Sequence, residues 1–212
     1  MRVNEFFYSI QGESSHAGRP CAFIRLTGCN LRCSYCDTEY AFEAGMEMTI
    51  PEIVEAVGEY PTRLVLVTGG EPMLQPGIHE LLGALLDRGC SVLLETGGQV
   101  PLSGVDPRVH KIVDFKCPSS GMTGHNDYGN VGCLTMRDEV KFVVGDRPDF
   151  DWACARIREY DLTARVSAVH LSPVYGLLPL DRLAGWVLGC GLEVRLGLQL
   201  HKIIWPGVPR GV

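Results

Sequence analysis

The feature that most constrains this fold is the alternation of short β-branched runs with amphipathic segments. We predict strands at residues 22–26, 64–67, 92–94, 111–115, 140–144, 166–171 and 192–198. We predict helices at residues 49–59, 77–87, 149–159 and 180–188, the first opening with a capping-box pattern at Thr49 and Glu52. Strands that alternate with helices form right-handed βαβ units around a mostly parallel sheet.

A complete βα barrel of eight units usually needs about 250 residues, whereas this chain has 212. We therefore predict an α/β fold, an incomplete, open βα barrel of about six units with a mostly parallel sheet. The chain is too short for two ordinary domains and a linker, so residues 1–212 should form one domain. Reactive groups should gather in the loops after the strands, at residues 27–38, 68–72, 95–98, 116–118 and 172–175.

The distribution of charged and apolar residues argues against two classes of partner, nucleic acids and membranes. The net charge is −6 and the 19 Lys and Arg residues are scattered singly, so no broad cationic surface is available for nucleic acid. No stretch approaches the roughly 18 apolar residues of a membrane span, and the N-terminus lacks the pattern of a targeting sequence. We expect a cytoplasmic protein with a small-molecule substrate, no nucleic acid and no membrane partner.

Three of the nine cysteines, Cys29, Cys33 and Cys36, lie close together directly after a predicted strand. A tetrahedral zinc site would need a fourth Cys or His nearby, and this loop contains none. Three thiolates on a 4Fe-4S cluster instead leave one iron open to a small ligand. Three purely structural thiols at this spacing are the alternative. The other six are widely separated and should be small core residues: Cys21, Cys90, Cys117, Cys133, Cys154 and Cys190.

The C-x3-C-x2-C spacing, with Tyr35 before the last cysteine, resembles the radical S-adenosylmethionine (SAM) superfamily. This resemblance implies that SAM binds the open iron and is cleaved to methionine and a 5′-deoxyadenosyl radical. The TGGEP sequence at 68–72 looks like the superfamily's methionine-binding loop, although alone it could be an ordinary tight turn. The resemblance assigns to SAM the residues Tyr35, Cys36, Asp37, Gly70, Asp114, Phe115, Lys116, Ser172, Pro173, Val174 and Tyr175.

A more specific resemblance extends from Phe6 to His201. Its motifs are FYSIQGE at 7–13, GRP at 18–20, FIRLTGCNL at 23–31, CDT at 36–38, TGGEP at 68–72, ETGG at 95–98 and QLHK at 199–202. In this order they are similar to the 7-carboxy-7-deazaguanine synthase family. The resemblance implies ring contraction of 6-carboxy-5,6,7,8-tetrahydropterin to 7-carboxy-7-deazaguanine with loss of ammonia, on the route to queuosine and other deazapurines.

The same resemblance implies a substrate site in the N-terminal segment. Its residues are Ile10, Gln11, Gly12, Glu13, Arg25 and Thr68. A flat, nitrogen-rich bicycle with a carboxylate suits these groups, because Glu13 can accept from ring NH groups and Arg25 can pair with the acid. The family pattern gives catalytic roles to Glu13, Arg25 and His201. Alternatively, residues 11–13 form a polar turn, Arg25 is a surface charge on an edge strand and His201 only packs.

The resemblance also implies Mg²⁺ at Thr38, where the metal would touch the substrate carboxylate. Magnesium keeps most of its waters and needs few protein oxygens, whereas a loop-capping hydroxyl is the alternative for Thr38. We further expect a flavodoxin-type electron donor and a homodimer. The tail that follows Trp205 extends past the end of some relatives, which leaves a contact between Val212 and substrate open.

Two other functions share part of this pattern. A glycyl-radical activating enzyme would carry the same cysteine loop but would not need Gln11, Glu13 and Arg25 as a set. A non-enzymatic zinc or iron-sulfur module would not need the TGGEP loop or a parallel sheet.

Overall fold

The computed structural model describes residues 1–212 and contains one nine-stranded sheet. Its order is β3-β1-β2-β4-β5-β6-β7-β8-β9. The strands are β1 Arg2–Ile10, β2 Pro20–Leu26, β3 Met46–Glu47, β4 Leu64–Gly69, β5 Ser91–Thr96, β6 His110–Asp114, β7 Glu139–Val144, β8 Ala168–Pro173 and β9 Arg195–Leu196. From β2 through β4 to β9 every neighbouring pair is parallel, and the edge strands β3 and β9 do not meet. The predicted open, mostly parallel α/β barrel is therefore confirmed.

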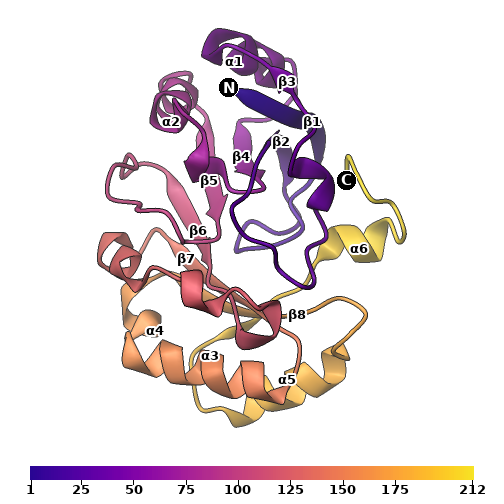
Figure 1. The fold of residues 1–212 in the computed structure, drawn as a ribbon, viewed down its shortest axis with the longest axis vertical. Helices are drawn as coiled ribbons and strands as arrows, with labels where there is room; N and C mark the ends of the chain where they lie inside the picture. The colour runs from indigo at the N-terminus through magenta and orange to yellow at the C-terminus, as the bar shows by residue number, and fades with distance from the viewer.

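Helices α1 to α5 cover the outside of the curved sheet, whereas α6 lies near the C-terminus (Figure 1). The helices are α1 Ile50–Gly58, α2 Ile78–Asp87, α3 Arg147–Glu159, α4 Leu162–Arg165, α5 Leu180–Gly189 and α6 Leu200–Ile204. Short 3-10 turns occupy Glu39–Ala41, Pro72–Leu74, Pro118–Ser120, Thr123–His125 and Tyr128–Cys133. The Thr49 hydroxyl and the Glu52 side chain form the predicted capping box of α1. Of the six connections between parallel strands, those from β5 to β6 and from β6 to β7 contain no α-helix.

Strand β1 was not among the predicted strands, and it pairs antiparallel with both β2 and β3. Only Val3 and Phe7 of β1 are buried, so its sequence lacks the apolar run of an interior strand. At the other edge, β9 is shorter than the predicted 192–198. Gly197 follows β9 directly and packs on the Ser172 side chain, while its amide donates to the Leu171 carbonyl at 2.8 Å. The loop after β1 (residues 11–19) leads back into β2 and is called the β1–β2 loop below.

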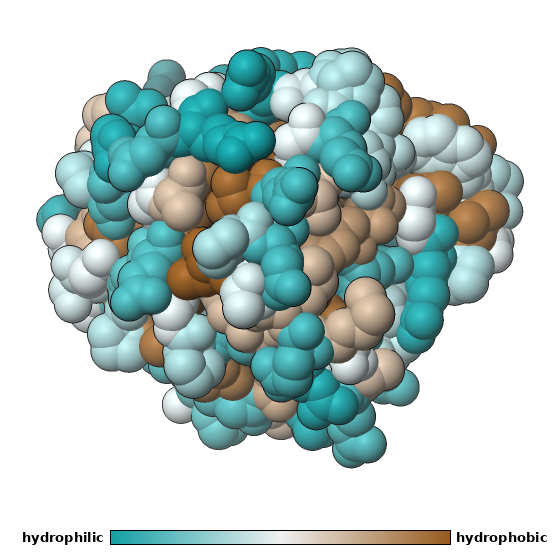
Figure 2. All heavy atoms as spheres, turned by 90° about the horizontal axis from the view of Figure 1, so that it is seen from above, coloured by the Kyte–Doolittle hydropathy of each residue, from teal (hydrophilic) through white to brown (hydrophobic).

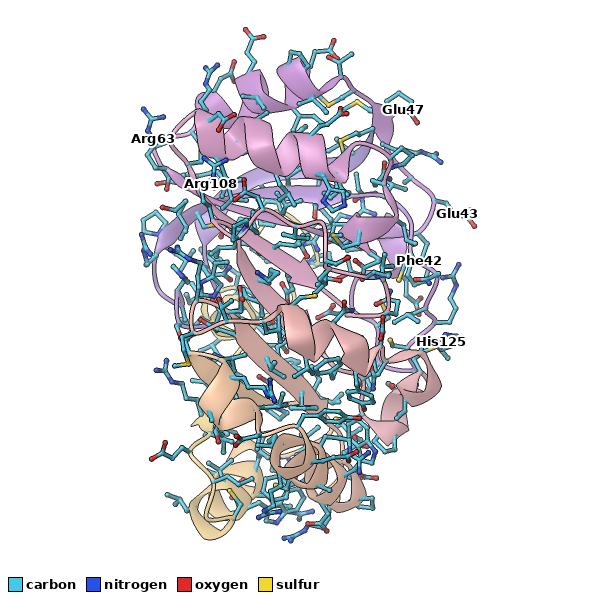
Figure 3. The ribbon with its side chains drawn as sticks, turned by 90° about the vertical axis from the view of Figure 1, so that its left-hand side faces the viewer. Phe42, Glu43, Glu47, Arg63, Arg108 and His125 are labelled. Carbon is cyan, nitrogen blue, oxygen red and sulfur yellow. The ribbon has the colours of Figure 1, made fainter.

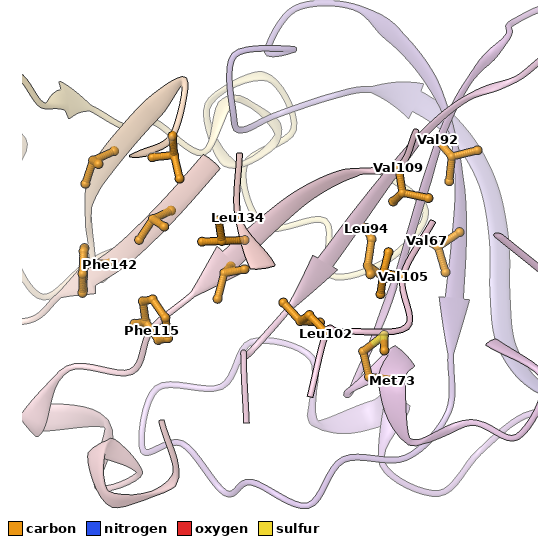
Figure 4. Close-up of a cluster of buried hydrophobic side chains, with 14 of the residues drawn as sticks. Val67, Met73, Val92, Leu94, Leu102, Val105, Val109, Phe115, Leu134 and Phe142 are labelled. Carbon is orange, nitrogen blue, oxygen red and sulfur yellow. The ribbon is translucent and has the colours of Figure 1, made fainter. Parts of the chain in front are cut away.

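Two clusters of buried apolar side chains pack against the two faces of the sheet. The outer layer packs helices onto the sheet, and Figure 4 shows part of it, including Val67, Leu94 and Phe142. The inner layer fills the lower part of the barrel with Phe7, Cys21, Phe23, Leu64, Leu66, Leu93 and Ile112. The inner face therefore combines this apolar layer with polar residues, both around the cavity at the carboxyl ends of the strands and at Glu139 and His110, the first residues of β7 and β6.

The surface is mixed in character. Polar and apolar residues are interspersed on the face viewed from above (Figure 2). Charged side chains such as Glu47, Arg63 and Arg108 project outward in Figure 3. No helix combines the length and the apolar character that crossing a bilayer requires.

All nine cysteines are free thiols. Of the six outside the triad, Cys21, Cys117 and Cys154 are buried. The other three pack half-buried against the outer core: Cys90, Cys133 and Cys190. These positions match the predicted role of small apolar residues.

Candidate active site

A cavity of about 320 Å³ opens where the parallel strands end. Its wall contains all but three of the predicted site residues: Ile10, Gln11, Gly12, Glu13, Arg25, Cys29, Cys33, Tyr35, Cys36, Asp37, Thr38, Thr68, Gly70, Asp114, Lys116, Val174, Tyr175 and His201. Segments that are nearly 200 residues apart in sequence, at Ile10 and His201, thus meet in one site.

Phe115, Ser172 and Pro173 do not line this cavity, in contrast to the sequence-based expectation. Side chains alternate along a strand and just beyond it, so Asp114 and Lys116 face inward while Phe115 faces the outer core. There the Phe115 ring lies 6.1 Å from that of Phe142 (Figure 4). The Ser172 side chain is buried against Gly197, a contact that occupies the space beside it.

The three cluster cysteines line the cavity on a loop that backbone hydrogen bonds stabilise. The Cys36 amide donates to the Cys33 carbonyl at 3.1 Å, and the Ser34 amide donates to the Ser120 carbonyl at 3.0 Å. Burial is the main cause that raises the pKa of the thiols of Cys29, Cys33 and Cys36. Binding of iron by these groups would therefore release protons. Three half-buried thiols that face one cavity fit a cluster with one open iron.

The TGGEP loop packs directly on the cysteine loop. The Glu71 amide donates to the Gly28 carbonyl at 2.7 Å, and a side chain at Gly70 would collide with this carbonyl and with Cys29. The buried Glu71 carboxylate accepts from the Thr96 hydroxyl and the Gly97 amide, each at 2.8 Å. Glu71 therefore ties the loop after β4 to the loop after β5 and keeps the cavity wall open next to the cysteines.

Two buried acceptors in the wall have no hydrogen-bond donor within the protein. They are Asp114 Oδ1 and Gln99 Oε1. Lys116 Nζ lies 3.0 Å from the other Asp114 oxygen. Buried polar atoms are almost always hydrogen-bonded, so these two are suited to donors of a ligand.

The β1–β2 loop and the C-terminal segment form the opposite wall. The Leu200 amide donates to the Gly12 carbonyl at 3.0 Å, and the Gln199 side chain donates to Glu13 Oε1 at 2.9 Å. Burial lowers the pKa of His201, which keeps its imidazole neutral more readily near neutral pH. Gly12, Glu13 and His201 are therefore brought together, as the motif order predicted.

Lys141 lies at the centre of the polar floor. Its ammonium is 2.7 Å from Glu13 Oε2, 2.5 Å from Glu95 Oε1 and 3.6 Å from Asp114 Oδ2. Burial alone would raise the pKa of Glu13, but the contacts with Lys141 lower it overall. Burial raises the pKa of Glu95 despite the same partner, while the surrounding carboxylates raise the pKa of Lys141 well above its ordinary value.

Arg25 is not a surface charge, because its side chain is only 15% exposed. Its Nε donates to Glu5 Oε1 at 2.7 Å, and the Tyr40 hydroxyl donates to the same oxygen at 3.0 Å. The guanidinium also lies over the rings of Phe7 and Tyr40. Glu5 binds only the Nε of Arg25, so the two terminal nitrogen atoms of the guanidinium remain available to a ligand in the cavity.

Thr38 does not cap the turn that follows it. Its hydroxyl donates to Asp37 Oδ1 at 2.9 Å, and Lys202 Nζ lies 2.6 Å from Asp37 Oδ2. Although burial opposes ionisation, Lys202 lowers the pKa of Asp37 to about 2. The ionised Asp37 carboxylate and the Thr38 hydroxyl therefore lie side by side at the edge of the cavity.

Comparison with known proteins decides the family. The Radical SAM superfamily profile matches residues 23–167. The 7-carboxy-7-deazaguanine synthase of Chlorobaculum tepidum is 49% identical over 100% of this chain and 97% of its own. That of Koribacter versatilis is 44% identical over the full length of both chains. This chain belongs to the 7-carboxy-7-deazaguanine synthase family. The crystal structure of QueE from Escherichia coli has the same fold, with a TM-score of 0.76, 24% identity and 93% coverage of both chains.

Membership of the 7-carboxy-7-deazaguanine synthase family confirms a radical SAM enzyme with a 4Fe-4S cluster and SAM as cofactors. It excludes the glycyl-radical activating enzyme and the non-enzymatic metal module as the principal function. The geometry agrees, because the cysteine loop shares its cavity with residues 11–13.

The sequence analysis assigned no specific role to several residues that shape this site. They are Glu5, Tyr40, Glu95, Lys141, Gln199, Lys202 and Arg210. Lys141 carried a signal, since a lone charge within the apolar run 140–144 must be buried and paired. Arg210 carried none: it reaches the site because the tail folds back, with its guanidinium 3.9 Å from the Tyr40 ring centre. Val212 also lines the cavity.

Proposed function

We propose that this protein converts 6-carboxy-5,6,7,8-tetrahydropterin to 7-carboxy-7-deazaguanine with loss of ammonia, in the biosynthesis of queuosine and related deazapurines. Family membership over the full chain supports this reaction. The observation that carries it is a single cavity that contains the three cluster cysteines and the polar set of Glu13, Arg25 and Thr68.

The cofactors would occupy the cysteine side of the cavity. Cys29, Cys33 and Cys36 would hold the cluster, which when bound supplies the electron that cleaves SAM. Gly70 offers bare backbone beside Cys29, and the unsatisfied Asp114 Oδ1 offers an acceptor for SAM. Tyr35, Asp37, Lys116, Val174 and Tyr175 complete the proposed SAM wall.

The pterin would lie against the opposite wall. Glu13, held ionised by Lys141, can accept from the exocyclic amine and a ring NH. Arg25 can pair with the carboxylate through the nitrogen atoms that Glu5 leaves free. Gln11, Thr68 and His201 would fix the remaining edges, and this orientation matters because small misplacements of a reacting atom are costly.

We place Mg²⁺ beside Thr38, whose hydroxyl is not engaged in capping. Hydroxyl and carboxylate oxygens suit this hard cation, which usually takes few protein ligands. The substrate carboxylate would complete its shell, so the metal and Arg25 would share one acid group.

Three further proposals concern the protein's setting. A flavodoxin-type protein would supply electrons to the cluster, and the enzyme would act as a homodimer. Nine free thiols suit a reducing compartment, so we propose a cytoplasmic location.

The test is anaerobic incubation of the reconstituted enzyme with SAM, a reductant and 6-carboxy-5,6,7,8-tetrahydropterin, followed by mass spectrometry. We expect 7-carboxy-7-deazaguanine and ammonia in amounts that greatly exceed methionine and 5′-deoxyadenosine, because SAM is regenerated in this reaction. SAM cleavage without any deazaguanine product would refute the substrate assignment. Product in a fixed one-to-one ratio with methionine would refute regeneration.

A further inference from the structure

Strand β7 presents two charged side chains to the barrel interior, and both reach the β1–β2 loop. Lys141 contacts Glu13 of that loop, as described above. Glu139, two positions earlier on the same face, accepts from the Ser15 amide through both carboxylate oxygens, at 3.0 and 3.1 Å. Since β1 and β7 are separated by four strands in the sheet, these contacts bridge the open barrel through its interior.

Glu139 is a fully buried carboxylate that lies close to two histidines. His170 Nε2 lies 2.7 Å from one oxygen, and His110 Nε2 lies 3.1 Å from the other. These histidines come from the strands on either side, β8 and β6. The ring of His16, in the β1–β2 loop itself, packs edge-on against His110 with 4.9 Å between ring centres. The titratable groups that face Glu139 thus come from β6, β8 and the loop that it anchors.

The conformation of the loop needs such an anchor. Ser14 has a φ of 63°, in the left-handed region that non-glycine residues rarely adopt. Such a residue costs free energy and persists only where its surroundings hold it in place. Ser15 supplies that restraint, because its amide donates to Glu139 and its hydroxyl accepts from Arg195 at 2.8 Å.

The carboxylate of Glu139 remains ionised in the folded protein. Burial would raise its pKa, but the contacts with His110 and His170 lower it well below the ordinary value. Charge-assisted hydrogen bonds are roughly twice as strong as neutral ones, so the ionised form holds the Ser15 amide tightly.

We propose that Glu139 is a positioning residue that acts through Ser15 to hold Glu13 in the orientation that binds substrate. This inference rests on the proposed function, since Glu13 is the assigned pterin partner. Lys141 fixes the carboxylate of Glu13, while Glu139 fixes the backbone two residues further along. Lys141 and Glu139 together hold the β1–β2 loop in place, although the edge strands β3 and β9 do not pair to close the barrel.

The neighbouring residue Asp138 provides a matched control. It is equally buried, but its carboxylate accepts from the amides of Lys111 and Thr135, at 2.9 and 2.8 Å, and lies 3.1 Å from Lys111 Nζ. None of its contacts is with the β1–β2 loop. Glu139→Gln and Asp138→Asn each remove one buried charge with little change of shape. Both should lower the melting temperature, whereas only Glu139→Gln should loosen the loop.

The experiment measures both variants as full-length reconstituted enzymes. Hydrogen exchange, followed by mass spectrometry without pterin, reports on a peptide that contains Ser15. We expect the protected amide of Ser15 to exchange about tenfold faster in Glu139→Gln, because replacing a charged acceptor by a neutral one removes about half of its bond strength. The KM for pterin should rise about tenfold, while the KM for SAM stays within about twofold of wild type.

Unchanged exchange at Ser15 in Glu139→Gln, or equal changes in Asp138→Asn, would overturn the proposal. A KM that rises equally for pterin and SAM would also overturn it, since general destabilisation would then explain the effect. If the wild type makes no product from the pterin, the proposed function fails, and the exchange experiment still decides whether Glu139 holds the loop.

Discussion

Gly12 and His201 are packed so closely that a Cβ on Gly12 would lie 2.5 Å from the imidazole Nδ1 of His201. The Gly12 carbonyl also accepts from the amide of Leu200. The N-terminal substrate loop and the C-terminal segment therefore form one closely packed wall.

Gly12→Ala should impair product formation more than it impairs folding. The added methyl group must displace His201, and overpacking of this kind typically costs about 1 to 3 kcal/mol. We expect a lower kcat/KM for the pterin with intact iron content, measured by steady-state kinetics and by iron analysis. Gly83→Ala is the control, because this glycine lies within α2 with open space around it and should gain up to about 1 kcal/mol of stability. Normal pterin turnover in Gly12→Ala would show that the contact with His201 has no role in the site.

Lys141→Met should be among the most damaging single substitutions outside the cysteines. It leaves the carboxylates of Glu13, Glu95 and Asp114 without their shared cation in a buried site. Removing one partner of a buried pair typically costs about 3 to 5 kcal/mol. Chemical unfolding at neutral pH measures this loss, and a loss near zero would contradict the central role of Lys141.

The loss in Lys141→Met should depend on pH in a defined direction. In wild type, Lys141 lowers the pKa of Glu13 from its ordinary 4.5, so this contribution is present above that value and fades as pH falls. In the variant, burial without the cation raises the carboxylate pKa values, so protonation stabilises the folded state as pH falls. The difference in unfolding free energy should therefore shrink from about pH 7 to about pH 4.5. A difference that stays constant over this window would show that electrostatics is not its cause.

The interior parallel strands β4 to β8 were predictable, because each contains a short run of buried apolar residues, even where a charged side chain such as Lys141 interrupts it. Strand β1 was not, since it lies near the edge and only Val3 and Phe7 of its residues are buried. Where a motif fixed the spacing, as for Cys29 and Gly70, the structure places the predicted residues in the wall of one cavity.

Side-chain direction explains why Phe115 lies outside the cavity wall. A run of three consecutive residues at 114–116 cannot present all its side chains to one cavity, so Phe115 packs in the outer core. The pairing of Glu13 with Lys141, 128 residues later, follows from barrel curvature, which no local pattern encodes.

Replacing Cys29, Cys33 or Cys36 by Ala should abolish the cluster, because each thiolate is one of only three protein ligands to it. We expect loss of iron, sulfide and SAM cleavage in each variant. Cys90→Ala is the control, since this thiol packs half-buried against the core and lies outside the cavity. Full iron content in any of these three variants would show that the replaced cysteine is not a cluster ligand.

Thr38 separates the proposed metal from the cluster, because its hydroxyl lies at the cavity edge next to Asp37 while its backbone belongs to the cysteine loop. Thr38→Val keeps the shape of the side chain and removes the oxygen, so the cluster and substrate-free SAM cleavage should persist. Product formation should become less responsive to Mg²⁺.

Thr38→Ser retains the hydroxyl and should keep most of the response to Mg²⁺. Arg25→Ala provides a contrast, because losing a charge-assisted pair costs about 1.5 to 3 kcal/mol, or roughly 10- to 150-fold in pterin affinity, with the metal response retained. The measurement is the steady-state rate of all three variants across a magnesium titration in chelator-treated buffer. If wild type ignores Mg²⁺, or if Thr38→Val responds as wild type does, the hydroxyl serves only its hydrogen bond to Asp37 and the metal lies elsewhere or is not used.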